Sequence, residues 1–290
     1  MAIKKTYKIT PKNDISIFGS ADLSSDKSLS IRAILFASIA HGISKISIRN
    51  PGEDALTAIT AVKKLGIKIF KNNCDYTIYG LGIGYPQNEN NIVIDCRNSG
   101  TTLRLLTPMI AGSKVNAKII GDQSLSKRPY RLEFLKNFLM NVRPTNKKYL
   151  PLKVEGHENC IQSNIKIEKP SAQMVSAATI AGISSFGKTL IKCPNNVRDH
   201  TTRILKYLNY PIKVSNKQNV QIIEVTGKQL LKPFENYSVP SDPSSSAFLI
   251  SIAILTKGSK IKINNVCLNP FRIGFIKILK RMGAKILFRN

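Results

Sequence analysis

Lys27, Ser28 and Arg32 are the residues of this sequence best suited, by type and spacing, to bind an anion. They open the stretch SSDKSLSIRAILFASIAHG, whose apolar run predicts a helix with these residues at its start. The first turn of a helix has backbone N–H groups without partners, and the helix dipole favours negative charge there. Arg32 follows Ser28 by one turn on the same face, so the three side chains can converge on one phosphate or carboxylate. In the alternative interpretation, Ser25 or Asp26 merely caps the helix and the cations extend into solvent.

Two further predicted helix starts carry residues that could contact a ligand. In NSGTTLR, Gly100 removes a side chain where the backbone could approach a ligand closely, and Asn98 or Ser99 can cap the helix. In KPSAQMVSA, Ser171 can cap, and Gln173 offers an amide that both donates and accepts hydrogen bonds. Each of these signals is weak alone, and their recurrence at helix starts favours a shared site.

The stretch SLSKRPYR offers two more cations, Lys127 and Arg128, directly before a proline that fixes the loop. The arrangement suits an anion clamp and is equally compatible with a solvated turn.

A different stretch, GISSFGKT at 182–189, matches the phosphate-binding pattern G-x-x-x-x-G-K-[ST] letter for letter. That pattern binds phosphates only between a strand and a following helix, whereas here an apolar helix precedes it and a strand follows. We therefore reject a nucleotide site there.

Four segments with the same order of features position these residues. Each has a small polar cap, a helix rich in Ala, Ser and Ile, a Gly near its end and a strand, followed by a second, amphipathic helix and another strand. With Ser28, Thr101, Ser171 and Ser244 as equivalent marks, the intervals are 73, 70 and 73 residues. Such a spacing predicts a repeated supersecondary unit and an α/β fold.

The second amphipathic helices are expected in ALTAITAVKKLGIKIF, YRLEFLKNFLMNVRP, TTRILKYLNYPIKV and RIGFIKILKRMGAKILF. The first and third segments then add a further strand, which completes a hairpin. The fourth ends at KILFRN, halfway through its hairpin. Because an unpaired strand leaves an exposed edge, we expect the sequence to be C-terminally truncated.

Composition narrows the class of protein. The 290 residues are 42% hydrophobic, enough for one large or two medium globular domains. No run of about 18 apolar residues and no apolar signal core is present, which favours a soluble, cytoplasmic protein without a membrane partner. Five cysteines lie far apart without C-x-x-C pairs, and three histidines show no ligand spacing, which favours reduced core thiols and no metal.

The net charge of +27 is compatible with an anionic substrate or with nucleic acid as a partner. Since no basic block is interleaved with aromatic residues, we expect no nucleic-acid partner.

Seven stretches, in chain order, resemble the successive motifs of the 5-enolpyruvylshikimate-3-phosphate synthase family. The resemblance begins near Lys8 and continues to the last residue. The motifs are DKSLSIR, NSGTTLRLL, GDQSLSKRPY, PSAQMVSA, VRDHTTRIL, DPSSSAF and LNPFRIGFIKILKRMGA.

The resemblance implies the enolpyruvyl transferase fold, α/β with repeated βαβαββ units in two inverted α/β barrel-like domains, four of six units being present here. Residues 1–22 would supply the N-terminal strand of domain 1. Residues 23–239 would form a complete domain of three repeats, and residues 240–290 a partial return to domain 1 with one incomplete repeat.

The implied reaction is a carboxyvinyl transfer from phosphoenolpyruvate to the 5-hydroxyl of shikimate 3-phosphate, which gives 5-enolpyruvylshikimate 3-phosphate and phosphate in aromatic amino-acid biosynthesis. Lys27, Ser28 and Arg32 would hold shikimate 3-phosphate, with Lys27 also touching phosphoenolpyruvate. Arg198 would reach the 3-phosphate, and Ser171 the shikimate portion.

The same resemblance implies residues for phosphoenolpyruvate. Gly100 and Arg128 would contact it, with Asn98 beside them, and Gln173 would reach both substrates. The acid and base residues of the family would lie beyond Asn290, so we expect little turnover by these 290 residues. The implied protein is a monomer without a cofactor. The alternatives are the related UDP-N-acetylglucosamine enolpyruvyl transferase and an inactive anion-binding fragment.

Overall fold

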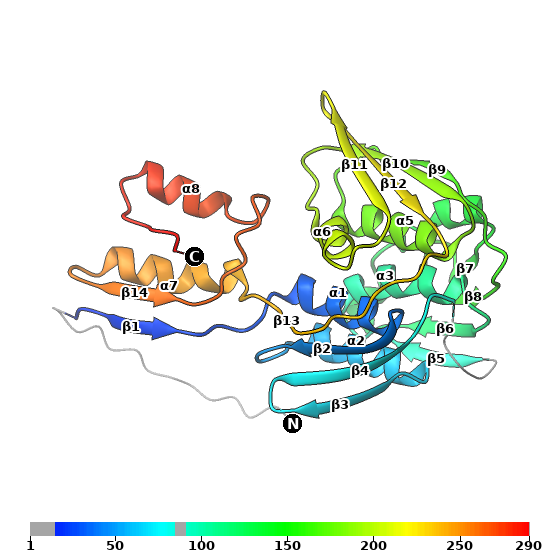
Figure 1. Ribbon diagram of the computed structural model, residues 1–290, viewed down its shortest axis with the longest axis horizontal. Coiled ribbons are helices and arrows are strands. Elements are labelled where there is room, and N and C mark those ends of the chain that lie inside the picture. The colour runs from blue at the N-terminus through cyan, green and yellow to red at the C-terminus, as the bar shows by residue number, and fades with distance from the viewer. Residues whose placement is uncertain (1–14, 85–90, 290) are drawn as a thin grey trace. The chain divides into compact units, whose positions relative to one another are not determined.

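The computed structural model describes residues 15–84 and 91–289 (Figure 1). By its internal contacts the chain divides into two compact units. The larger is Ser24–Pro240, and the smaller combines Met1–Leu23 with Ser241–Asn290. Residues 1–14, which fall in the predicted N-terminal strand segment, lie outside the described residues.

Three helices form the centre of the larger unit. They are α1 (Lys27–Ser38), α3 (Gly100–Ala111) and α5 (Ala172–Ser184), and nearly all their residues are buried. α3 packs against both α1 and α5. Small and apolar residues all around a helix are typical of one that is covered on every side. The helices predicted at these three starts are confirmed.

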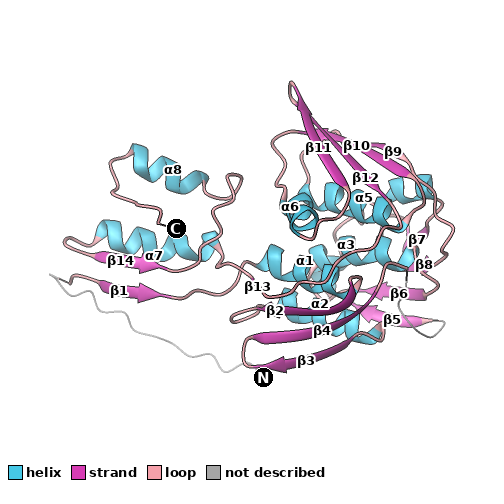
Figure 2. Cartoon of the chain, viewed as in Figure 1, coloured by secondary structure: helices cyan, strands magenta, loops and turns pink. Residues whose placement is uncertain are grey.

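Three four-stranded sheets surround these helices in the larger unit (Figure 2). Their strand orders are β13-β2-β4-β3, β5-β6-β8-β7 and β9-β10-β12-β11. In each sheet the first two strands are parallel and the other contacts are antiparallel. The first sheet has β2 (His41–Ser47), β3 (Lys68–Asn72), β4 (Asp75–Leu81) and β13 (Tyr237–Ser238). The second has β5 (Ile92–Asp95), β6 (Asn116–Ile120), β7 (Asn141–Asn146) and β8 (Tyr149–Glu155). The third has β9 (Asn164–Lys166), β10 (Lys188–Pro194), β11 (Ile212–Lys217) and β12 (Val220–Thr226).

The first sheet is completed from the far end of the unit. β13 pairs in parallel with β2, with Tyr237 opposite Ile46 and Ser238 opposite Ser47. It takes the place that β5 and β9 hold in the other two sheets. The larger unit is therefore closed: its last strand belongs to its first sheet.

The second helices follow the prediction in three cases. α2 (Glu53–Lys64), α6 (His200–Tyr207) and, in the smaller unit, α8 (Gly274–Arg281) are α-helices. The prediction of an amphipathic α-helix in YRLEFLKNFLMNVRP is wrong, because that segment forms a 3₁₀ helix, η1 (Glu133–Phe138), after the one-turn helix α4 (Gln123–Ser126). Left-handed residues at both sides, Arg131 at φ 58° and Leu139 at φ 61°, limit the helical stretch.

The smaller unit contains β1 (Phe18–Ala21), α7 (Pro243–Leu255), β14 (Lys260–Ile263) and α8 (Gly274–Arg281). β1 pairs in parallel with β14. The predicted strand in KILFRN is wrong for residues 285–289, which are not in a strand and have no partner strand within the described residues. In the part of the chain that the structure describes, no helix is long and apolar enough to cross a membrane.

Two further expectations concern local chemistry. All five cysteines are free thiols, as predicted, and four of them are buried. The prediction of a core position is wrong for Cys74, which is partly exposed. In the GISSFGKT stretch, α5 ends at Ser184 and β10 begins at Lys188, so helix precedes strand. The predicted order of helix and strand around this stretch is confirmed.

Candidate functional site

Asp26 caps α1, because its carboxylate accepts a hydrogen bond from the backbone N–H of Leu29 at 2.9 Å. Lys27 lies in the first turn with its ammonium 3.3 Å from the Asp54 carboxylate, and its side chain is 57% exposed. An ion pair this open contributes little to stability, so Lys27 is available to a ligand.

Arg32 does not extend into solvent, so the alternative interpretation is wrong for this residue: it is only 3% exposed. Its Nε donates to Thr201 Oγ1 at 2.9 Å, and its Nη2 donates to Ser176 Oγ at 2.8 Å. Its Nη1 donates to the Ser28 carbonyl at 2.9 Å. All three acceptors are neutral. Burial, together with the neighbouring charge of Arg198, lowers the pKa of Arg32 to about 10, and Asp26 opposes this shift.

Arg198 joins the same group of residues from the loop before α6. Its Nη1 donates to Ser28 Oγ at 3.2 Å across 170 residues of sequence. Ser28 therefore holds one arginine with its hydroxyl and another with its carbonyl. The structure thus brings Ser28, Arg32 and Arg198 together, while Lys27, the third residue of the predicted convergence, pairs with Asp54. Two neighbouring guanidinium groups favour an anion between them.

Asn98 and Arg128 also lie together, near the start of α3. Arg128 Nη2 donates to Asn98 Oδ1 and to Ser124 Oγ, both at 2.8 Å. The Asn98 amide in turn donates to the Asp122 carboxylate at 2.8 Å. Ser99, not Asn98, caps α3 by accepting from Thr102 N at 3.3 Å. The Asn98 amide thus orients Arg128.

Gly100 is accompanied by an arginine that the sequence analysis did not single out. Arg104 Nη1 donates to the Gly100 carbonyl at 3.2 Å, and Nη2 donates to the Pro129 carbonyl at 2.9 Å. Burial lowers the pKa of Arg104, with Arg131 and Arg128 adding to the effect. The one signal in the sequence was its position four residues after Gly100, the same spacing that separates Arg32 from Ser28.

Hydrogen bonds join the starts of these helices. Ser171 caps α5, and Gln173 Nε2 donates to Thr101 Oγ1 at 3.0 Å, which links α5 to α3. Asp54, the ion-pair partner of Lys27, accepts at its carbonyl from Thr102 Oγ1 at 3.5 Å, which links α2 to α3. The predicted residues therefore come from helix starts that contact one another. Ser176 and Thr201 were missed, since a Ser or Thr inside a helix gives no signal in sequence.

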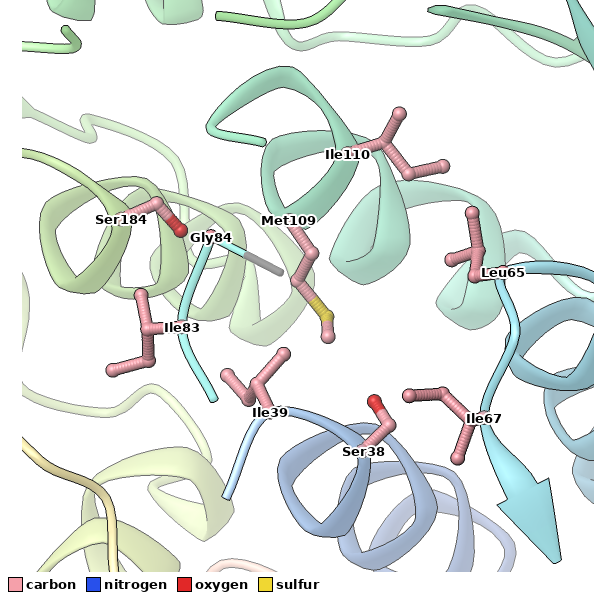
Figure 3. A pocket seen from close by; sticks show the side chains of 9 residues that line it. All are labelled: Ser38, Ile39, Leu65, Ile67, Ile83, Gly84, Met109, Ile110 and Ser184. Carbon is pink, nitrogen blue, oxygen red and sulfur yellow. The ribbon is translucent and has the colours of Figure 1, made fainter. Parts of the chain in front are cut away.

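A pocket of the larger unit lies at the opposite ends of the central helices (Figure 3). Ser38, Met109 and Ser184, near the ends of α1, α3 and α5, line it together with mostly apolar neighbours. None of the predicted site residues lines this pocket. The candidate site is thus formed by the helix starts, where the dipoles favour an anion.

The fold and the site define a class: an α/β protein built of repeated units, with the buried arginines Arg32 and Arg104 near the starts of two central helices. The family described as EPSP synthase (3-phosphoshikimate 1-carboxyvinyltransferase) matches residues 12–289, and this chain belongs to that family.

Similar proteins of known name and similar solved structures agree with this family membership. The 3-phosphoshikimate 1-carboxyvinyltransferase of Ruthia magnifica subsp. Calyptogena magnifica is 37% identical over 98% of this chain and 64% of its own length. That of Bacillus cytotoxicus is 38% identical over 92% of this chain and 62% of its own length. A structure of EPSP synthase from Acinetobacter baumannii superposes with a TM-score of 0.86 at 33% identity and covers 96% of this chain and 63% of that one. The chain thus spans a little under two thirds of the length of these relatives.

Proposed function

We propose that this chain provides substrate-binding residues for the carboxyvinyl transfer of its family. In that reaction the 5-hydroxyl oxygen of shikimate 3-phosphate bonds to C2 of phosphoenolpyruvate while a proton is added at C3. The tetrahedral intermediate then loses phosphate and a proton, which gives 5-enolpyruvylshikimate 3-phosphate. Cations that face the phosphate and carboxylate groups stabilise this highly charged intermediate.

The observation that carries the proposal is the state of Arg32. Its guanidinium is buried, and its hydrogen bonds to protein end on two hydroxyls and one carbonyl. A buried cation held by neutral acceptors is costly unless a charged partner joins it. Shikimate 3-phosphate supplies that charged partner in our proposal, with Ser28 beside Arg32 and Arg198 reaching the 3-phosphate.

Phosphoenolpyruvate is assigned to the start of α3. Arg128 would bind it, oriented by Asn98, and Lys27 would approach it from α1. Gly100 would leave its backbone accessible. Ser171 would bind the shikimate portion, and Gln173, which already reaches Thr101 on α3, would lie between both substrates.

The proposal extends to the organisation of the chain. Residues 23–239 would be a complete domain of three repeats, which the three sheets of identical strand order support. Residues 1–22 and 240–290 would belong to a second domain, so that four of six family repeats are represented in this sequence. We further propose action as a cytoplasmic monomer without a metal or organic cofactor.

Calorimetric titration with shikimate 3-phosphate tests the proposal. Arg32→Ala should weaken binding by about 2 to 4 kcal/mol, the scale for losing one partner of a buried, charged hydrogen bond. Arg143→Ala is the control, since Arg143 is exposed on β7 and its Nε donates to Asn141 Oδ1, a residue outside the proposed site. Unchanged binding by the Arg32 variant would overturn the assignment. Release of phosphate that requires both substrates, measured on the whole protein, tests the reaction itself.

A further inference from the structure

Two buried hydroxyls form a hydrogen-bonded chain behind the Arg32 guanidinium. Thr201 Oγ1 lies 2.7 Å from Ser176 Oγ, and Ser176 Oγ donates to the Ala172 carbonyl at 2.6 Å. Ser176 is 2% exposed and Thr201 is 3% exposed. α6 brings Thr201 against α1, across 169 residues of sequence from Arg32.

The hydrogen bonds that link Thr201, Ser176 and the Ala172 carbonyl can run in only one donor-to-acceptor direction. A hydroxyl has a single proton, and Ser176 uses its proton on the Ala172 carbonyl, which can only accept. The proton between the two hydroxyls must therefore come from Thr201. Both oxygens are left to accept from Arg32, Thr201 from Nε and Ser176 from Nη2. Both hydroxyl protons are committed, so each hydroxyl keeps a lone pair directed at the guanidinium.

This arrangement fixes Arg32 without neutralising it. A guanidinium has five N–H groups. Thr201, Ser176 and the Ser28 carbonyl take three of them and leave one on Nη1 and one on Nη2. A carboxylate in place of either hydroxyl would orient the guanidinium equally well but would cancel its charge. Hydroxyls give the orientation and keep the full positive charge for a ligand.

We propose that Thr201 and Ser176 are positioning residues that hold Arg32 as an oriented cation, hydrogen-bonded to neutral groups, for an anionic group of a substrate. The inference rests on the proposed function, in which that substrate is shikimate 3-phosphate. It adds that affinity for this substrate depends on two hydroxyls that act through Arg32.

The test compares Thr201→Val, which keeps the shape and removes the hydroxyl, with Thr201→Ser, which restores it. Thr201→Val should raise the Kd for shikimate 3-phosphate about 10- to 100-fold, the range for a hydrogen bond to a charged group. Thr201→Ser should stay within about threefold of the parent chain, since the serine retains the same donor and acceptor. Ser176→Ala should behave as Thr201→Val does, because it breaks the same chain.

Thr179→Val is the matched control. Thr179 is also a buried threonine, on α5, and its hydroxyl donates to the Val175 carbonyl. A purely structural role of Thr201 would change unfolding by urea, and would change the affinities for shikimate 3-phosphate and phosphoenolpyruvate alike. Our inference requires the loss to fall on shikimate 3-phosphate alone.

Comparison with Arg32→Ala distinguishes failure of the proposed binding site from failure of the positioning role of Thr201. If Arg32→Ala and Thr201→Val both leave shikimate 3-phosphate binding intact, the proposed site itself is wrong. If Arg32→Ala weakens binding and Thr201→Val does not, the site stands and the positioning role is overturned.

Discussion

Arg104 Nη1 lies 2.7 Å from the position that a Cβ atom on Gly100 would occupy. The same nitrogen donates to the Gly100 carbonyl, and the other end of the guanidinium holds the Pro129 carbonyl. Gly100 does not have a positive φ. A side chain at position 100 is thus limited by space and not by backbone conformation, because Arg104, which ties the start of α3 to the loop of Arg128, would have to move.

Gly100→Ala should therefore displace Arg104 and cost about 1 to 3 kcal/mol of unfolding free energy, the usual penalty for overpacking. In an Arg104→Ala background the same methyl group meets Leu125 Cδ1 at 3.6 Å, an ordinary contact, so its cost should fall, and the double-mutant cycle should show a coupling of about 0.5 kcal/mol or more. Urea denaturation measures both quantities.

Gly52→Ala serves as the control for that cycle. Gly52 also stands at a helix start, at the N-cap of α2, and no atom lies within 4 Å of its built Cβ. Equal costs for Gly100→Ala with and without Arg104 would show that the arginine does not define the space.

Asp54→Asn should change the unfolding free energy by no more than about 1 kcal/mol, because the ion pair with Lys27 is largely exposed. It should strengthen binding of phosphoenolpyruvate severalfold, because Lys27 loses its competing carboxylate. Glu53→Gln removes a charge from the same first turn of α2. Glu53 has no ion pair in the described part of the chain, so Glu53→Gln changes the net charge by the same amount as Asp54→Asn but leaves the Lys27–Asp54 ion pair in place. Similar affinities for the two variants would contradict a role for the Lys27 pairing.

Cys96 should make stability fall at alkaline pH. Burial, with a contribution from Asp95, raises the pKa of this thiol from 9.0 to about 12. Above pH 9 the unfolded chain therefore loses a proton that the folded chain keeps. Unfolding becomes more favourable as pH rises toward 12, by up to about 1.4 kcal/mol per pH unit. Below pH 9 both states keep the proton and the effect is absent.

Urea denaturation under reducing conditions between pH 8.5 and 10.5 measures this dependence. The stability of Cys96→Ala relative to the parent chain should improve steadily over that range. Cys74→Ala controls for the loss of a thiol at a partly exposed position. Parallel pH profiles for the parent chain and Cys96→Ala would refute the prediction.

Native thiol reactivity should single out Cys74. It is partly exposed, whereas Cys96, Cys160 and Cys193 are buried, and burial raises the pKa of Cys160 and of Cys193 to about 11. Only the thiolate reacts rapidly. A disulfide reagent at pH 8 should label Cys74 first, and Cys74→Ser should remove one equivalent from the fast phase. An unchanged fast phase would place the reactive thiol elsewhere.

The features that could be predicted from the sequence are those set by residues close together along the chain. The central helices were predicted because each is a long apolar run after a polar cap, and the repeat was visible because the three sheets reuse one order of elements. Lys27, Ser28 and Arg32 were identified because one helix start places them together. η1 was missed because its apolar spacing resembles that of an α-helix, while the left-handed residues that confine it leave no such pattern.

The rest of the site depends on contacts that are distant in sequence. Nothing local shows that Thr201 would lie behind Arg32, or that Arg198 would reach Ser28, since each pair is joined only when α6 packs against α1. Arg104 is hidden for another reason. Its partners are the carbonyls of Gly100 and Pro129, and backbone groups have no identity in a sequence.

The position of β13 has a consequence for synthesis on the ribosome. β2 is among the first strands of the larger unit to emerge, yet its parallel neighbour at residues 237–238 is among the last (Figure 1). Until then one edge of β2 has backbone groups without their final partners, and such an edge can pair with other chains. A contact between residues this far apart also closes late and slowly. The nascent chain therefore carries an open sheet edge during nearly the whole translation of the unit, and this is the interval in which a chaperone would protect it from aggregation.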